Sequence, residues 1–288
     1  MERSTLAWFR AAVPDDSSPR DDTWVLVEAL RSRYDIDVVT AAGAHDFVWK
    51  HFRRPYDLCI FELRSDRAHA FVPPYLVHYP GIVLLRGRPV GTGRILYRSR
   101  VVVTPHSAAV PTIEDEYPGV RVRYIPASVS SPGAWRGDEI VIDAAWPPTD
   151  DALTTALSGM AAGKPVIALE SEYTADWPAL NPQTWQPRGA GTPILVSIDP
   201  RDYDHSLKLA MQRLDADADL RARLGAAARD WFASHATRDY VVAAWASLIE
   251  EAKTLAPPEP PEGWKAVQDG TERAREILAE FGTTVDLF

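Results

Sequence analysis

The 288-residue chain has little of several features that would place it in a class directly. Its single cysteine, Cys59, excludes an internal disulfide, and the apolar run YDLCIFEL around it predicts a buried thiol in a reducing compartment. No hydrophobic run reaches the length of a membrane span, and residues 1–22 lack the apolar core of a signal peptide. These absences predict a cytoplasmic protein without a membrane span.

Positive charge is scarce as well, and the formal net charge of −9 at pH 7 argues against a general nucleic-acid-binding protein. The histidines outside position 106 show no metal-ligand spacing, so no metal site is predicted. The segment Arg64–Arg100 differs from the rest, because it holds arginines at 64, 67, 86, 88, 94, 98 and 100 and the single acid Asp66. It is either a solvated face paired with acids elsewhere, or an anion-binding surface that a protein partner could use.

Strands and helices alternate along residues 1–128, which predicts a doubly wound α/β domain. The expected strands cover 4–11, 35–41, 56–63, 82–87, 100–106 and 120–127. A helix is expected over 23–34, where Asp21 or Asp22 can cap its first turn. Shorter helices are expected over 45–54 and 108–119, and the segment broken by Pro73 and Pro74 is either helical or irregular.

The Ser/Pro/Gly-rich segment 128–137 predicts a domain boundary. Beyond it we expect strands over 138–146, 164–170 and 193–199, a loop leading into a helix over 147–163, and helices over 202–214, 218–236 and 238–255. Residues 173–191 show no regular period. The prediction is an N-terminal domain over 1–128, a reduced second domain over 138–255, and a Pro-rich spacer with a tail helix over 256–288. The apolar face of this tail, Ile277, Leu278, Phe281 and Phe288, is expected to pack on the first domain.

Three segments in this order, AHAFVPPYLVHYPGIVLLRG, SRVVVTPHSAAV and LSGMAAGKPVIALE, resemble bacterial family-4 glycosyltransferases of the GT-B fold. The resemblance implies two facing Rossmann-like domains, with the acceptor on the first and a nucleotide-sugar donor on the second. It also implies a C-terminal helix that crosses back to the first domain. The implied reaction is sugar transfer with retention, in which the nucleotide sugar is a substrate and no resident cofactor is needed.

The candidate donor-side residues lie in and just before the third of these segments. The loop residues Thr149, Asp150 and Asp151 begin a helix whose N-terminus suits a diphosphate, although the two acids are also ordinary first-turn residues. Ser158 stands where the family has a glutamate, and Asp150 lies nearest the other family glutamate. Lys164 and Glu170 flank the following strand, and Lys164 is equally explained as a solvated turn residue.

On the acceptor side, Arg86, Arg88 and His106 follow expected strands, at the edge where α/β sheets bind ligands. Several family features are absent from the sequence: two β-α units with a diphosphate-binding Arg and Lys, the Gly-rich loop after strand one, and a His-Asp pair, replaced by Arg86 and Gly87. Two functions therefore stay open. One is a compact glycosyltransferase, and the other is a catalytically inactive scaffold or binding partner derived from one.

Overall fold

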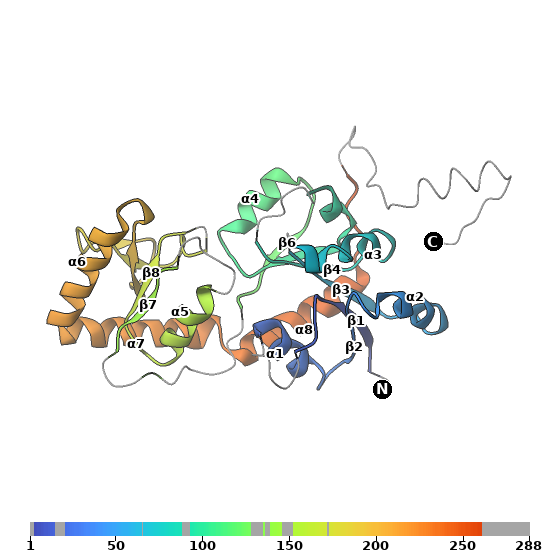
Figure 1. The fold of residues 1–288 in the computed structure, drawn as a ribbon, viewed down its shortest axis with the longest axis horizontal. Helices are drawn as coiled ribbons and strands as arrows, with labels where there is room; N and C mark the ends of the chain where they lie inside the picture. Colours follow the sequence, from blue (N-terminus) through green and yellow to red (C-terminus); the bar gives the residue numbers. More distant parts are fainter. Residues whose placement is uncertain are drawn as a thin grey trace.

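The protein is an α/β structure built on two sheets, seen here in a computed structural model (Figure 1). The model describes residues 3–14, 21–64, 66–87, 93–127, 135, 139–145, 152–171 and 173–260. The first lobe is the six-stranded sheet with the helices packed on it, and the second lobe is the five-stranded sheet with its helices. The linker 128–137, apart from Trp135, and the tail from Trp264 to Phe288 lie outside the described residues.

The first sheet is parallel throughout, in the order β2-β1-β3-β4-β5-β6. Its strands are β1 (Thr5–Phe9), β2 (Asp35–Val39), β3 (Leu58–Leu63), β4 (Ile82–Leu85), β5 (Val101–Thr104) and β6 (Val122–Tyr124). Its helices are α1 (Asp22–Leu30), α2 (Ala44–Arg53), α3 (Val72–His78) and α4 (Ala109–Glu116), with short turns η1 (Arg67–His69) and η2 (Gly93–Arg98). From β1 the chain adds β2 on one side and then β3 to β6 on the other, so the strand order reverses between β1 and β3, as in doubly wound nucleotide-binding folds.

Both faces of this sheet are buried, which explains why its strands are nearly continuous apolar runs. Alternate residues of each strand enter two separate cores. Leu6 and Trp8 of β1 face α1 and α8, while Ala7 and Phe9 face α2 and α3. Cys59 lies in the second of these cores, and burial raises the pKa of its thiol to about 12, so the predicted buried thiol is confirmed.

The second sheet has the order β10-β9-β11-β8-β7, parallel except for the β9–β10 pair. Its strands are β7 (Val141–Asp143), β8 (Val166–Leu169), β9 (Ala179–Leu180), β10 (Pro187–Arg188) and β11 (Leu195–Ile198). Its helices are α5 (Ala152–Ala161), α6 (Tyr203–Ala216) and α7 (Ala218–His235), with the short turn η3 (Pro200–Asp202). The two-residue strands β9 and β10 fall in the segment 173–191, where the sequence shows no period.

The turn from α5 to β8 depends on two glycines. Gly163 has a positive φ of 68°, which agrees with the sequence expectation of a turn at this position. A Cβ on Gly225 of α7 would lie 2.1 Å from the carbonyl oxygen of Gly163, so α7 passes the turn in close backbone contact. This close approach packs α5 and α7 together on one face of the second sheet.

The last described helix, α8 (Arg238–Thr254), leaves the second lobe and packs on the first (Figure 1). Trp245 of α8 packs against Trp8 with ring centroids 5.3 Å apart. The hydroxyl of Tyr34 donates to Glu250 at 3.0 Å, and Arg100 donates to the carbonyl of Ala252 at 3.1 Å. The sequence-based domain limits assign residues 238–255 to the second domain, whereas the contacts of α8 are with the first sheet.

Candidate functional site

Ligands of doubly wound folds bind beyond the carboxyl ends of the strands, at the point where strand order reverses. In the first lobe this point lies between β1 and β3, and charged side chains gather there. Arg10 directly follows β1, Glu62 lies near the end of β3, and Arg86 directly follows β4. We call these three residues, with Asp21, Asp22 and Arg64, the edge cluster.

The alternation of strand side chains explains how the cluster forms. Residues 6 and 8 of β1, 58 and 60 of β3, and 82 and 84 of β4 all face the core under α1 and α8. Continuing each series by two residues places Arg10, Glu62 and Arg86 on that same face, where the apolar core ends. Strand register pairs Phe9 with Phe61, so Arg10 and Glu62 are neighbours.

Arg86 is held by the first turn of α1. Its Nη2 donates to both carboxylate oxygens of Asp22 at 2.7 Å and also to the hydroxyl of Thr23. Asp21 caps α1 by accepting from the backbone N–H of Trp24 at 2.7 Å, and it forms an ion pair with Arg10. Of the two expected caps, Asp21 therefore holds the helix, while Asp22 is committed to Arg86. Arg86 is 5% exposed, so it serves to join α1 to β4.

Glu62 lies at the centre of the edge cluster and is 2% exposed. Three guanidinium nitrogens surround its carboxylate: Nε of Arg64 at 3.6 Å, of Arg86 at 3.7 Å and of Arg10 at 3.9 Å. These distances are longer than hydrogen bonds, so Glu62 attracts the three arginines by charge and not through aligned hydrogen bonds. Because three acids balance three arginines, the cluster offers no net charge to an incoming anion.

The strand ends of the two lobes meet at His106 and Tyr173. His106 follows β5 and is 3% exposed, while Tyr173 follows β8, and their ring centroids are 4.0 Å apart. Burial also raises the pKa of Tyr124, at the end of β6, and the nearby Asp176 of the second lobe contributes. The carboxyl ends of β5, β6 and β8 therefore lie on either side of one contact between the lobes.

The second lobe presents a partly exposed group of charges at its strand ends. Glu170, which follows β8, forms a bidentate ion pair with Arg188 at 2.6 and 2.7 Å. Asp199, which follows β11, pairs with Arg201 at 2.8 Å, and this pair lowers the pKa of Asp199, with a smaller contribution from Arg188. Both arginines are reachable from solvent, since their side chains are 34% and 88% exposed.

Asp143, the last residue of β7, is a buried carboxyl at the same edge, 9% exposed. Burial disfavours its charged form and raises its pKa to about 6, although it accepts a hydrogen bond from the backbone N–H of Ala156 at 3.0 Å. Five residues at these strand ends were not among the site residues expected from the sequence: Asp143, Arg188, Tyr173, Arg10 and Glu62. Position at or just after a strand end is the signal that could have found Asp143, Glu62 and Arg10.

The other predicted donor-side residues are spread apart. Ser158 lies on α5 and its hydroxyl accepts from the indole N–H of Trp135 at 3.4 Å, which ties the linker to the second lobe. Lys164 precedes β8, so it lies at the amino end of the strand, whereas Glu170 lies at the carboxyl end. Thr149, Asp150, Asp151 and Arg88 lie outside the described residues.

The Arg64–Arg100 segment does not form one exposed basic surface. Arg86 is buried in the edge cluster at the carboxyl end of the sheet, and Arg64 pairs there with Glu62. Arg100 precedes β5, at the opposite edge, and donates to carbonyls of α8. These three arginines are bound to neighbouring parts of the chain, whereas Arg67 and Arg94 are exposed, so the two interpretations of this segment stay open.

Within the described ranges, no three His, Cys, Asp or Glu side chains come close enough to hold a metal ion. In the same part of the chain, no helix is both long and apolar enough to cross a bilayer. Comparison with protein-family models finds no match, and a search of curated proteins also finds none. The functional assignment therefore depends on the geometry of the strand ends.

Proposed function

We propose that the protein is glycosyltransferase-like and holds a nucleotide sugar between the carboxyl ends of its two sheets, in a GT-B arrangement. The contact between His106 and Tyr173 carries this proposal, because it brings strand ends of both sheets to one place. Parallel sheets bind ligands at that edge. The return of α8 to the first sheet and the three resembling sequence segments support the same assignment.

In this proposal the second lobe binds the donor. Arg188 and Arg201 supply positive charge at its strand ends, where the expected Arg and Lys of the family are absent from the sequence. A diphosphate offers the same bidentate geometry as a carboxylate, so it can replace Glu170 as the partner of Arg188. Stabilising the departing diphosphate is the main electrostatic task in retaining sugar transfer.

The first lobe takes the acceptor side. Arg86 is already bound to Asp22 and Thr23, so we assign it to holding the strand ends in place. His106 is the acceptor-side residue nearest the second lobe, and an imidazole there can take a proton from an acceptor hydroxyl.

A catalytically inactive binding protein is the second candidate function. The observation that favours it is the internal pairing of the charged groups at both edges: Arg86 with Asp22, and Glu170 with Arg188. In this alternative the lobes keep their shape and present a surface to a partner, and no donor is turned over.

The experiment that separates these functions is incubation of the protein with uridine and guanosine diphosphate sugars, followed by assay for released nucleoside diphosphate. Release that is lost in Arg188→Ala and retained in Arg223→Ala, an exposed arginine of α7, supports the transferase. Stabilisation by a nucleotide sugar without release supports the inactive binding protein. The absence of both release and stabilisation with every nucleotide sugar tested would overturn the proposal.

A further inference from the structure

The outer face of α2 is unusual for a helix on a protein surface. Three large apolar side chains project from it: Val48 is 42% exposed, Trp49 is 68% exposed and Phe52 is 80% exposed. Ala44 and Phe47 bury the adjoining side of the same helix against the core of the first lobe. A surface helix normally presents polar residues outward, so the apolar outer face of α2 requires an explanation other than folding.

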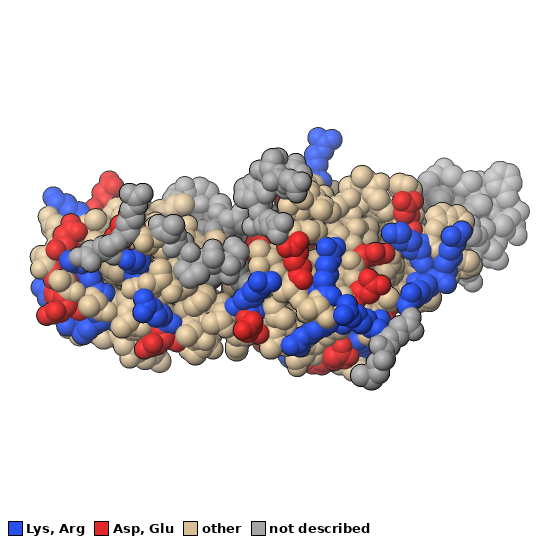
Figure 2. Space-filling model, turned by 90° about the horizontal axis from the view of Figure 1, so that it is seen from below, with Lys and Arg blue, Asp and Glu red and all other residues tan. Residues whose placement is uncertain are grey.

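Basic side chains surround the C-terminal half of this helix. Lys50, Arg53 and Arg54 lie in or directly after its last turn. In Figure 2 many of the Lys and Arg side chains gather at the end of the first lobe where Figure 1 places α2. Lys50 is paired with Asp37 at 3.4 Å, so the arginines supply most of the positive charge there.

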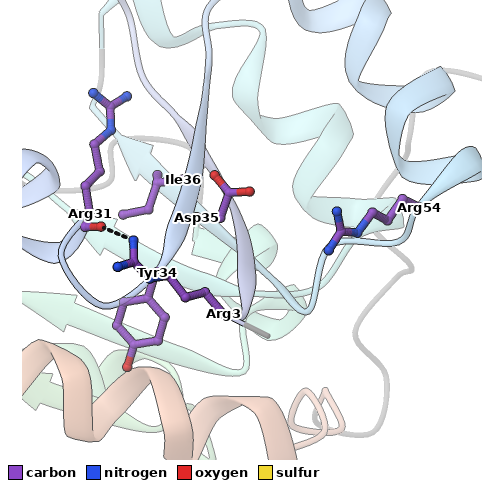
Figure 3. A pocket seen from close by; sticks show the side chains of 6 residues that line it. All are labelled: Arg3, Arg31, Tyr34, Asp35, Ile36 and Arg54. Atoms are coloured by element: carbon purple, nitrogen blue, oxygen red, sulfur yellow. Dashed lines mark hydrogen bonds between the residues drawn. The ribbon is translucent and has the colours of Figure 1, made fainter. Parts of the chain in front are cut away.

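A pocket of about 520 Å³ continues this basic region at the amino-terminal edge of the first sheet (Figure 3). It is lined by Arg3, Arg31, Tyr34, Asp35, Ile36 and Arg54. Figure 3 shows Arg3 and Arg54 on either side of Asp35, while the side chain of Arg31 points away and stacks over Trp24 at 5.3 Å. Two arginines, Arg3 and Arg54, against one acid, Asp35, leave this pocket with a net positive charge.

We propose that this face, formed by α2 and the adjoining arginine pocket, docks on the surface of a bilayer that contains anionic lipids. Indole and phenyl rings enter the headgroup boundary, while arginines pair with lipid phosphates, as in interfacial amphipathic helices. The cations of the region, Arg3, Lys50, Arg53 and Arg54, outnumber its acids, Asp35, Asp37 and Asp46, so its net charge is complementary to such a surface although the whole chain carries a net charge of −9. This inference does not depend on the proposed sugar transfer.

A second copy of the chain suits this face poorly. A symmetric dimer formed through this face would bring both copies of its basic side chains into one interface, with repulsion wherever like charges meet. Stable protein interfaces also bury about 800 Å² on each partner, and here the apolar contribution comes from three side chains of a single helix. A membrane imposes neither requirement, because its phosphates are the counter-charge and a few inserted rings suffice.

The test is flotation of the full chain with vesicles of phosphatidylcholine alone, or of phosphatidylcholine mixed with phosphatidylglycerol. We expect flotation with the anionic vesicles, loss of it in the double variant Trp49→Ala/Phe52→Ala, and loss in Arg53→Glu/Arg54→Glu. The matched controls are Tyr240→Ala, an exposed aromatic of α8, and Arg223→Glu on α7, both of which should still float. Unchanged melting temperatures verify that the α2 variants fold.

Three results would overturn the proposal. The first is the absence of flotation with either vesicle, and the second is equal flotation with neutral and anionic vesicles. The third is a dimer in solution that Trp49→Ala dissociates, which would make α2 a self-association surface.

Discussion

Charged side chains at the carboxyl-terminal strand ends are arranged differently in the two lobes. In the first lobe, Glu62 and Arg86 are almost fully buried within a balanced cluster of three acids and three arginines. In the second lobe, the ion pairs of Glu170 and Asp199 are partly exposed, and Asp143 is the one buried carboxyl among the described residues of that lobe. The edge of the first lobe is thus held together by its charges, whereas that of the second keeps its arginines within reach of a ligand.

The substitution Arg86→Ala tests most strongly whether the charges of the edge cluster hold the first lobe together. Its removal leaves Asp22 without its arginine and Glu62 with two of its three, and an uncompensated buried charge costs about 3–5 kcal/mol of unfolding free energy. Chemical denaturation of the variant should show a loss of this size, while Arg67→Ala, at an exposed position of η1, should change stability by less than about 0.5 kcal/mol. A loss below about 1 kcal/mol would mean that the cluster is not essential to the fold of the first lobe.

In the second lobe, removing a buried charge, that of Asp143, is expected to raise the free energy of unfolding at neutral pH, whereas Arg86→Ala lowers it. The pKa of Asp143 is about 6 in the folded chain and near 4 when unfolded, so the folded state binds the extra proton between these values. Stability from this group is therefore present at low pH and is lost as pH rises through about 6, with a total near 2–3 kcal/mol. Asp143→Asn keeps an acceptor for Ala156 and should be more stable than the wild type at pH 8.

The advantage of Asp143→Asn should shrink as the pH is lowered toward 4, which denaturation curves across this range can measure. A constant difference between variant and wild type at every pH would contradict the assignment of a raised pKa. Neutralising Glu62 in the edge cluster should not raise the free energy of unfolding in this way, because three guanidinium groups would lose their central partner.

The second lobe is also stabilised by the close packing of α7 on the turn between α5 and β8. Gly225→Ala would place a Cβ 2.1 Å from the carbonyl oxygen of Gly163, so α7 must move away from the turn that precedes β8. We expect a loss of about 1–2 kcal/mol in unfolding free energy, after allowing for the better helix propensity of alanine. Arg223→Ala on the same helix should have little effect, and equal effects of the two substitutions would refute the close-contact explanation.

The smallest expected effect concerns Ser158, where the resembling family has a glutamate. Ser158→Ala removes one long hydrogen bond from Trp135, so thermal denaturation should show a loss of about 0.5–1 kcal/mol. A loss above about 2 kcal/mol would show that this contact does more than tie the linker to α5.

The sequence predicted the first lobe well because its pattern is local. Continuous apolar runs identified β3, β4 and β5, and the cap at Asp21 identified the start of α1. The strands β9 and β10 were missed because each is only two residues long, too short for any alternation to register. The position of α8 on the first lobe depends on contacts between residues far apart in the sequence, such as Trp8 and Trp245.

The candidate site was predicted less completely. His106, Arg86 and Glu170 were identified because each follows a strand, and the structure places all three at carboxyl-terminal strand ends. Their partners were not identified: the pairing of Glu170 with Arg188 joins the end of β8 to β10, and no local pattern encodes it. Whether an arginine at a strand end is bound within the chain, like Arg86, or reachable, like Arg188, depends on packing in three dimensions.

The central claim, that the facing strand ends bind a nucleotide sugar through the second lobe, is tested most directly by calorimetry. Uridine and guanosine diphosphates would be titrated into the wild type, Arg188→Ala and Arg223→Ala. The account predicts binding of at least one of them to the wild type, weakened about tenfold or more in Arg188→Ala because a charge-assisted hydrogen-bonded pair is lost, and unchanged in Arg223→Ala. No detectable binding to the wild type, or binding that Arg188→Ala leaves intact, would contradict it.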